Sequence, residues 1–346
     1  MHAFFASGTR ALRSVSIPAV LALAVSLPAP AAAIYNFTSF DGPGSNGGGT
    51  TVNGIDNNGA VVGFSSDNAA APTLLTNFIR NPDGTFTALN IGSDPLAMAN
   101  GINDAPAIVG SHSNGTAYVL VGGSLLPLSN VTPTTTSETA FGASDTGLIV
   151  GQFVDSATGT TPGFLLGGGG YTILIPVINA LVTNAQGVNN HGVVTGFYSA
   201  DGVHQHGFFY DSTTHAYTLA PDPVIANLVL TQFLGMNDLG VAAGYYQLPD
   251  GSQHGLLYDS NTHAYTFLDD PNAAHSGVSI TQITGINNSG ELTGFYVDAA
   301  SGLQRGFVAN PSIPTPEPGT FGSLALALVA ALPFRRRFAA RHATAR

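Results

Sequence analysis

Short runs of alternating apolar and polar residues fill the chain from residue 34 to residue 312, and clusters of Gly, Asn, Asp and Ser separate them. The segment Val193-Val194-Thr195-Gly196-Phe197-Tyr198 is representative, with β-branched and aromatic residues between turn formers. Such runs predict short β-strands joined by tight turns. Since no segment of this range shows a convincing helical period of apolar residues, we expect an all-β body.

A ten-residue pattern recurs six times, first as Gly-Ile-Asp-Asn-Asn-Gly-Ala-Val-Val-Gly at 54–63. Asn and Asp tolerate turn conformations and Gly supplies positive φ, so the pattern predicts a hairpin turn. The tenth residue is Gly in every copy, which predicts a bulge or a close backbone approach within a strand. We interpret the first residues of the six copies as turn glycines: Gly54, Gly101, Gly142, Gly187, Gly235 and Gly285.

A second strand pair follows the hairpin. His206 to Asp211 and His215 to Leu219 supply it in copy four, and copy five repeats both segments. Four strands in about 46 residues, repeated six times, predict a six-bladed β-propeller over 34–311, with 34–40 as the opening strand of the first unit. The alternative is an open β-solenoid or array. The predicted units lie near 34–84, 85–124, 125–170, 171–214, 215–263 and 264–311.

Residues 1–33 have the layout of a secretory signal peptide. Arg10 and Arg13 precede an apolar run over 17–27, and Ala31 and Ala33 then form a small-residue cleavage site. We expect signal peptidase to cleave after Ala33. The alternative is an uncleaved anchor helix.

Residues 312–346 have a second three-part layout. Pro316, Glu317 and Pro318 precede an apolar stretch over 321–334, and three arginines follow it, Arg335, Arg336 and Arg337. The stretch is short for a transmembrane helix, which needs ~20 residues, but local bilayer thinning accommodates such a mismatch. The positive-inside rule keeps the arginines in the cytoplasm and, with the N-terminus cleaved, places residues 34–318 outside the inner membrane. The alternative is an ordinary stop-transfer anchor.

This tail closely resembles the PEP-CTERM sorting signal of Gram-negative bacteria, in which a Pro-Glu-Pro motif, a short helix and a basic cluster follow in this order. The resemblance implies recognition by an exosortase, an integral-membrane cysteine transpeptidase. It also implies surface display or release, often in bacteria that make an extracellular polysaccharide matrix. The repeats resemble the HAF family of extracellular repeats, closely over 187–308, and this likeness implies an exported repeat protein.

Composition narrows the possible chemistry. The chain has no Cys, no Trp and no Lys, which excludes disulfides, thiol catalysis, Schiff-base lysines and a P-loop. Residues 34–318 hold two Arg and all twenty acidic residues, a formal charge of −18. Such a body repels phosphate backbones, so we expect no nucleic-acid partner.

Candidate metal ligands occupy repeated positions. His206 with His215, and His254 with His263, have metal-like spacings, but their repetition favours a role as strand-end hydrogen-bonding groups. Arg305 replaces the His in copy six, which favours a polar end group over an acid–base one. The Asp-rich loops at 155–159 and 298–302 lack the terminal Glu of a calcium loop, so we expect turns there, no resident cofactor and at most weak Ca²⁺ binding.

Candidates for catalysis are few. The chain has no Gly-x-Ser-x-Gly nucleophile motif, and Glu138 and Glu291 are the only glutamates of 34–312. Aromatic residues that could stack on sugar rings are Tyr198, Tyr210, Tyr246, Tyr258 and Tyr296, of which strand alternation should bury about half. We therefore expect a non-enzymatic surface or matrix protein that binds extracellular polysaccharide. The alternatives are a hydrolase or lyase with its site in the propeller channel, and a passive structural protein.

Overall fold

The computed structural model describes residues 34–45, 47–274 and 278–312. In these ranges the chain forms 24 β-strands and no helix, which confirms the all-β body. No helix that could span a membrane occurs there. The predicted signal peptide with Ala31 and Ala33 lies outside the described residues, as do the predicted helix of the tail and the residues Pro316, Glu317, Pro318, Arg335, Arg336 and Arg337.

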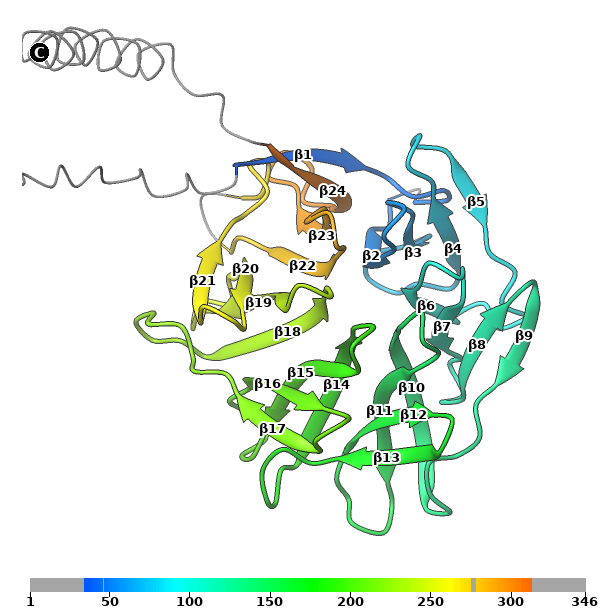
Figure 1. Cartoon of the computed structure of the whole chain (residues 1–346). Coiled ribbons are helices and arrows are strands. Elements are labelled where there is room, and N and C mark those ends of the chain that lie inside the picture. The colour runs from blue at the N-terminus through cyan, green and yellow to red at the C-terminus, as the bar shows by residue number, and fades with distance from the viewer. Residues whose placement is uncertain (1–33, 46, 275–277, 313–346) are drawn as a thin grey trace, which may run out of the picture. The chain divides into compact units, whose positions relative to one another are not determined.

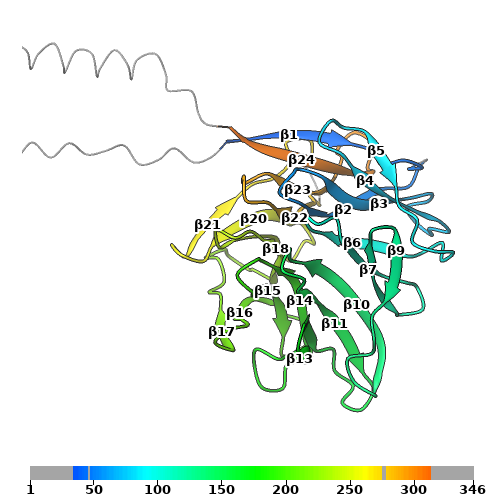
Figure 2. The same cartoon turned by 45° about the vertical axis from the view of Figure 1, so that its right-hand side comes forward.

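The strands form six antiparallel sheets of four strands each, arranged around one axis (Figure 1). Figure 2 shows the same ring after a turn of 45°. The innermost strand of every blade contacts the innermost strands of both neighbouring blades, so the ring is closed. This arrangement confirms the six-bladed propeller and rules out the open solenoid.

Each blade has its first strand at the channel and its fourth strand at the outer rim. Blade 1 has β2 (Thr50–Ile55), β3 (Val61–Ser66), β4 (Leu75–Arg80) and β5 (Phe86–Ala88), and blade 2 has β6 (Met98–Ile102), β7 (Ile108–Ser111), β8 (Ala117–Val121) and β9 (Ser124–Pro127). Blade 3 has β10 (Thr135–Ala143), β11 (Ile149–Asp155), β12 (Gly163–Gly167) and β13 (Gly170–Leu174), and blade 4 has β14 (Val182–Val188), β15 (Val193–Ser199), β16 (His206–Asp211) and β17 (Ala216–Leu219). Blade 5 has β18 (Leu230–Met236), β19 (Val241–Gln247), β20 (Gln253–Asp259) and β21 (Ala264–Phe267), and blade 6 has β22 (Thr281–Ile286), β23 (Leu292–Val297), β24 (Gln304–Ser312) and β1 (Ile34–Phe40).

The N-terminal strand completes the last blade. β1 pairs antiparallel with β24, from Ile34 opposite Ser312 to Phe40 opposite Gly306. The expectation that residues 34–40 open the first unit is therefore wrong. Pairing the two ends of the chain closes the ring by backbone hydrogen bonds and leaves β24 without a free edge.

Each predicted unit combines three strands of one blade with the outermost strand of the blade before it, so the predicted unit boundaries are wrong by one strand. Unit 215–263 was expected to start with 216–219, yet these residues form β17, the outermost strand of blade 4. A tight turn, in which His215 N–H bonds Asp211 O at 2.8 Å, joins them to β16. The sequence repeat predicts the number of residues in a blade, but not the strand at which each blade begins.

The ring has two unlike faces. At the turn face, short turns such as 56–60 join the inner strand of each blade to its second strand. At the opposite loop face lie longer connections such as 200–205 and 220–229. Because Ile34 lies opposite Ser312 at the end of β24, both described ends of the propeller lie at the turn face.

The tenth glycine of each copy makes room on both sides of the second strand. A Cβ on Gly151 would lie 2.0 Å from Thr139 O on the inner strand and 2.6 Å from the ring of Phe164 on the third. The inner strand bulges beside this glycine in all six blades, for example between Ala185 and Gly187. The predicted bulge or close backbone approach is confirmed.

Candidate functional site

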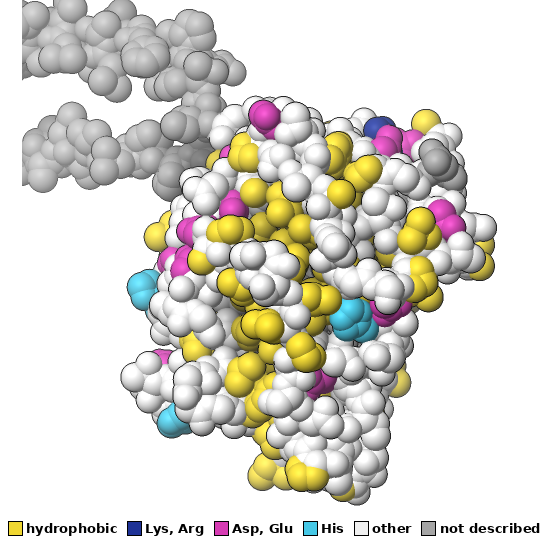
Figure 3. Space-filling model, turned by 90° about the vertical axis from the view of Figure 1, so that its right-hand side faces the viewer, with side chains coloured by type: hydrophobic (Ala, Val, Ile, Leu, Met, Phe, Trp, Pro, Cys, Tyr) yellow, Lys and Arg dark blue, Asp and Glu magenta, His cyan; other side chains and the backbone are white. Residues whose placement is uncertain are grey.

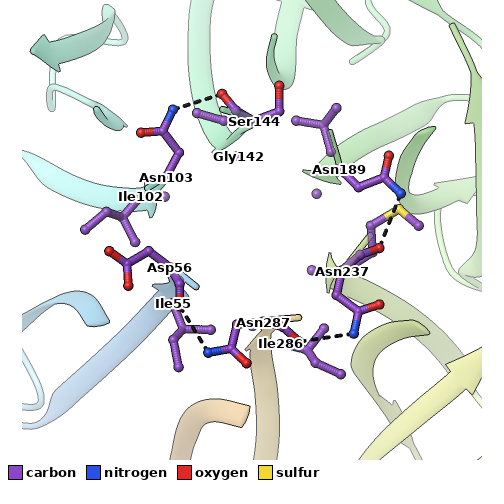
Figure 4. Close-up of a pocket in the computed structure, with 18 of the residues that line it drawn as sticks. Ile55, Asp56, Ile102, Asn103, Gly142, Ser144, Asn189, Asn237, Ile286 and Asn287 are labelled. Carbon is purple, nitrogen blue, oxygen red and sulfur yellow. Dashed lines mark hydrogen bonds between the residues drawn. The ribbon is translucent and has the colours of Figure 1, made fainter. Parts of the chain in front are cut away.

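A channel runs along the axis of the propeller, enclosed by the inner strands. A cavity of ≈ 100 Å³ opens at the turn face, and one of ≈ 230 Å³ lies nearer the loop face. Figure 4 shows the lining of the first cavity, to which all six blades contribute.

Six glycines meet around the channel. A Cβ on Gly54 would lie 3.4 Å from the Cα of Gly101, and one on Gly187 would lie 3.0 Å from the Cα of Gly235. The inner strands therefore approach too closely for side chains at this level. The prediction of turn glycines is wrong for Gly54, Gly101, Gly142, Gly187, Gly235 and Gly285, because all six lie in strands without positive φ. The positive φ of the turns belongs instead to Gly59, Gly147, Gly192, Gly240 and Gly290.

In four of the six turns, an Asn at the first polar position links its own turn to the next blade. Asn189 Oδ1 accepts the N–H groups of His191 and Val193, and its amide donates to Asn237 O at 3.2 Å. Equivalent inter-blade bonds join Asn237 to Asn287, Asn287 to Asp56 and Asn103 to Ser144 (Figure 4). Asp56 and Ser144 have no amide donor, so the inner ring has four such bonds.

The second Asx residue of each turn completes a ring of six bonds. The backbone N–H of Asn190 donates to Asp238 Oδ1 at 2.8 Å. The same bond repeats from blade to blade at 2.7–2.8 Å and returns from Asn288 to Asn57. The polar groups at the turn-face mouth thus hold neighbouring blades together.

Two equivalent surface groups lie at the loop face, one in blade 4 and one in blade 5. Tyr198 lies opposite His206 on the neighbouring strand, with ring centroids 5.6 Å apart. His206 Nδ1 and Asp222 Oδ2 are hydrogen-bonded at 2.8 Å. We call the two sets the Tyr–His–Asp groups: Tyr198, His206 and Asp222, and Tyr246, His254 and Asp269.

Blade 5 repeats this geometry closely. Tyr246 stacks on His254 at 5.1 Å, and His254 Nδ1 lies 2.7 Å from Asp269 Oδ2. Within the described ranges, no hydrogen bond reaches the Tyr246 hydroxyl or His254 Nε2. Burial, and secondarily the charge of Asp269, raises the pKa of Tyr246, so its hydroxyl stays protonated and can donate. Each group presents an aromatic ring beside uncommitted polar atoms.

Blade 6 has a different residue at the position of His206 and His254. Arg305 stands where the other two blades have His, and its guanidinium bonds both Asp41 oxygens at 2.9 and 3.0 Å. Tyr296, opposite Arg305, is fully buried. The position therefore holds a polar partner for an Asp of a loop-face connection, which confirms the predicted polar end group.

The predicted histidine pairs are not brought together, because His206 and His215 lie at opposite ends of β16. His215 Nδ1 is hydrogen-bonded to the Tyr210 hydroxyl at 2.8 Å, and His263 is bonded to Tyr258 in the same way at 2.9 Å. Tyr210 and Tyr258 are buried, as is Tyr296. Of the five tyrosines expected as stacking platforms, Tyr198 and Tyr246 alone remain partly accessible.

The two glutamates have different surroundings, since Glu138 is buried between blades and Glu291 lies at a turn of the turn face. Glu138 replaces the Thr of other inner strands between blades 2 and 3 and is 2% exposed. Neither of its carboxylate oxygens accepts a hydrogen bond from a described residue. Burial raises the pKa of Glu138 to about 7, although nearby N–H groups of Val131 and Ala117 lower it in part. Glu291 accepts a bond from Asn287 at 2.7 Å.

The Asp-rich loops form turns, as expected. Asp155 Oδ1 accepts the N–H of Ala157, and Asp298 Oδ1 accepts those of Ala300 and Ser301. Weak Ca²⁺ binding there stays a prediction.

Two features of these sites were not predicted from the sequence. Asp222 and Asp269 lie in connections of unequal length, so the repeat alignment does not place them at one position. The loop-side cavity is lined by the bulged residues, which vary from blade to blade. The sequence signal that could have indicated this cavity is the dipeptide Gln-His, which repeats at 205–206 and 253–254. Gln205 bonds the lining residue Gln232, and Gln253 bonds the lining residue Gln282.

No protein-family model and no curated protein matches this chain. Its path is similar to that of three solved structures, each at low identity. TolB from Acinetobacter baumannii aligns at 12% identity and TM-score 0.45 over 73% of this chain and 63% of its own. Aleuria aurantia lectin in complex with Fucα1-6GlcNAc aligns at 10% identity and TM-score 0.45 over 77% of this chain and 97% of its own. Trypanosoma rangeli sialidase aligns at 13% identity and TM-score 0.44 over 84% of this chain and 57% of its own. The propeller assignment rests on the strand pairing of this chain.

Proposed function

We propose that this chain is an exported, non-enzymatic β-propeller of the cell surface or extracellular matrix that binds uncharged polysaccharide. The observation that carries the proposal is the pair of equivalent Tyr–His–Asp groups at the loop face. A sugar ring offers an apolar face to an aromatic ring and hydroxyls to polar side chains, and each group supplies both.

The two groups are accessible to a large ligand. In blade 4 the side chains of His206 and Asp222 are 38% and 36% exposed. In blade 5 those of His254 and Asp269 are 22% and 35% exposed. Two binding points on one rigid ring suit a repetitive polymer, because the second contact follows the first at high effective concentration.

Acid–base chemistry fits these groups less well than binding. A His–Asp pair does orient an imidazole for proton transfer. However, blade 6 has Arg305 at the same position, and a guanidinium does not exchange a proton at physiological pH. Glu138, 2% exposed between blades, is too buried to touch a polymer.

Surface character supports the same ligand class. Figure 3 shows one side of the propeller with apolar and uncharged side chains and few charged ones. Residues 34–318 carry a formal charge of −18, which opposes binding of acidic polymers. A neutral polysaccharide is not repelled by this charge.

The binding test uses residues 34–312, a compact unit with its own core and a closed ring. The polymer is the purified extracellular polysaccharide of the producing bacterium. We expect Tyr198→Ala with Tyr246→Ala to weaken binding about tenfold or more, because one aromatic anchor is worth roughly 1.4 kcal/mol at such sites. Phe86→Ala, at an aromatic residue 38% exposed in blade 1, is the control and should bind normally. Equal binding by all three proteins would refute the proposed site.

The export route rests on the two ends of the chain. We expect the mature protein to begin at Ile34 and the Pro316-Glu317-Pro318 motif to direct exosortase sorting. Of the described residues, Ile34 and Ser312 are the two ends, and both lie at the turn face, away from the loop face. Glu317→Ala should retain the protein in the inner membrane, as cell fractionation would measure. Unchanged surface display in that variant would contradict the sorting proposal.

A further inference from the structure

We propose that the loop-side cavity of the channel binds a single uncharged sugar residue, entering from the loop face. The inference goes beyond the surface groups and rests on the proposed function for its ligand class alone. The carrying observation is a cavity lined by uncharged side chains, among which glutamine amides have unused hydrogen-bonding capacity.

The lining of this cavity is neutral and amide-rich. Its volume is ≈ 230 Å³, below the ~300–1,000 Å³ of sites for drug-sized ligands, which suits one small ring. None of its lining residues is Asp, Glu, His or Arg. The amides among them are Asn53, Asn100, Gln186, Gln232 and Gln282.

Four of these amides use part of their hydrogen-bonding capacity to hold neighbouring blades together, whereas Gln186 bonds within its own strand. Gln282 donates to Gln253 Oε1 at 2.7 Å, and Gln232 donates to Gln205 Oε1. Gln186 donates to Asn184 at 3.0 Å. In the described part of the chain, no hydrogen bond is donated to the side-chain oxygens of Gln186, Gln232 or Gln282.

An amide with a free oxygen and a second N–H can both accept and donate. Sugar hydroxyls also do both, whereas a carboxylate accepts only and an ammonium donates only. Phe141 and Phe295 add partly buried rings to the same lining and offer an apolar face to the C–H side of a sugar. The cavity is therefore complementary to a neutral polyol.

The fixed partners of these amides connect the cavity to the loop face. Gln205 directly precedes His206, and Gln253 directly precedes His254. A polymer bound at a Tyr–His–Asp group therefore contacts a histidine whose preceding residue is a glutamine that positions the cavity wall. This juxtaposition favours entry of a chain end from the same face.

The test fills the cavity with a residue that the fold already accepts. Phe141 occupies in blade 3 the position of Gln186 in blade 4, so Gln186→Phe should fold normally. Ile173→Phe is the matched control, because Ile173 lies on the outermost strand of blade 3, outside the cavity, and blade 5 has Phe267 at the same position.

Titration calorimetry with glucose, galactose, mannose and N-acetylglucosamine, and with glucuronate as the charged comparison, gives the readout. We expect at least one neutral sugar to bind both residues 34–312 and the Ile173→Phe variant. The same sugar should bind Gln186→Phe at least tenfold more weakly, and glucuronate should bind residues 34–312 at least tenfold more weakly than that sugar does. No binding of any neutral sugar, or binding that persists in Gln186→Phe, overturns the cavity proposal. Polysaccharide binding that depends on Tyr198 and Tyr246 but not on Gln186 would overturn it while leaving the proposed function intact.

Discussion

At the scale of single residues, consecutive Asn and Asp side chains have different tasks. Asn189 caps its own turn and bonds the next blade, whereas Asn190 accepts and donates along a second ring. The sequence predicts the turn from these residue types, since Asx side chains bond nearby backbone groups. Their inter-blade partners were not predictable, because they lie 41–50 residues away along the chain, or 231 residues away where the ring closes.

Glu138 makes the stability of the propeller depend on pH. Its pKa is raised from 4.5 to about 7 in the folded state, so folding favours the protonated form. The stabilisation is complete below the unfolded pKa and is lost as pH rises from about 4.5 to 7, with an amplitude on the order of 2–3 kcal/mol. We expect Glu138→Gln to raise the melting temperature by several degrees at pH 8 and to change it little at pH 4.5.

Glu291→Gln is the control for this prediction, because it removes the same charge from a turn where Glu291 has a hydrogen-bond donor. It should not reproduce the pH-dependent gain. Parallel melting curves for wild type and Glu138→Gln across this pH range would contradict the assignment.

At the scale of the strands, the six channel glycines set how closely the blades approach. Gly187→Ala places a Cβ 3.0 Å from the backbone of Gly235, and overpacking of this kind costs about 1–3 kcal/mol. We expect a clear drop in melting temperature. Gly169→Ala, at a turn position with nothing within 4 Å, should stay within about 0.5 kcal/mol of wild type. Equal stability of the two variants would show that the inner strands have room to spare.

The pairing of β1 with β24 makes a second prediction at this scale. Asn36 and Asn310 are directly opposite and both exposed, and the chain has no native Cys. Cysteines at both positions should form a disulfide and stabilise the fold by about 2–4 kcal/mol. The reduced form of the same variant is the control. Failure to form the bond under oxidising conditions would mean that the N-terminal strand does not close the ring.

At the scale of the whole molecule, the sequence predicts six blades because the glycine pattern repeats six times. It does not reveal that the N-terminal strand belongs to the last blade, since periodicity contains no information about where a ring is closed. The stacking tyrosines are a similar case. Strand alternation predicts that some are buried, but the choice of Tyr198 and Tyr246 over Tyr296 depends on the packing of each blade. Asn53, Asn100 and Gln186 of the cavity were missed because they lie at the bulges of their strands, where regular strand alternation does not predict the direction of a side chain.

The central claim is that the propeller binds a neutral polysaccharide through its loop face. The most direct test is a binding isotherm of residues 34–312 on the extracellular polysaccharide of the producing bacterium, at physiological salt and at ~1 M, where the Debye length falls to ~3 Å. The account predicts saturable binding with nearly the same affinity at both salt concentrations, because neither the ligand nor the contacts are ionic. Absence of saturation, or binding that disappears at high salt, would contradict it.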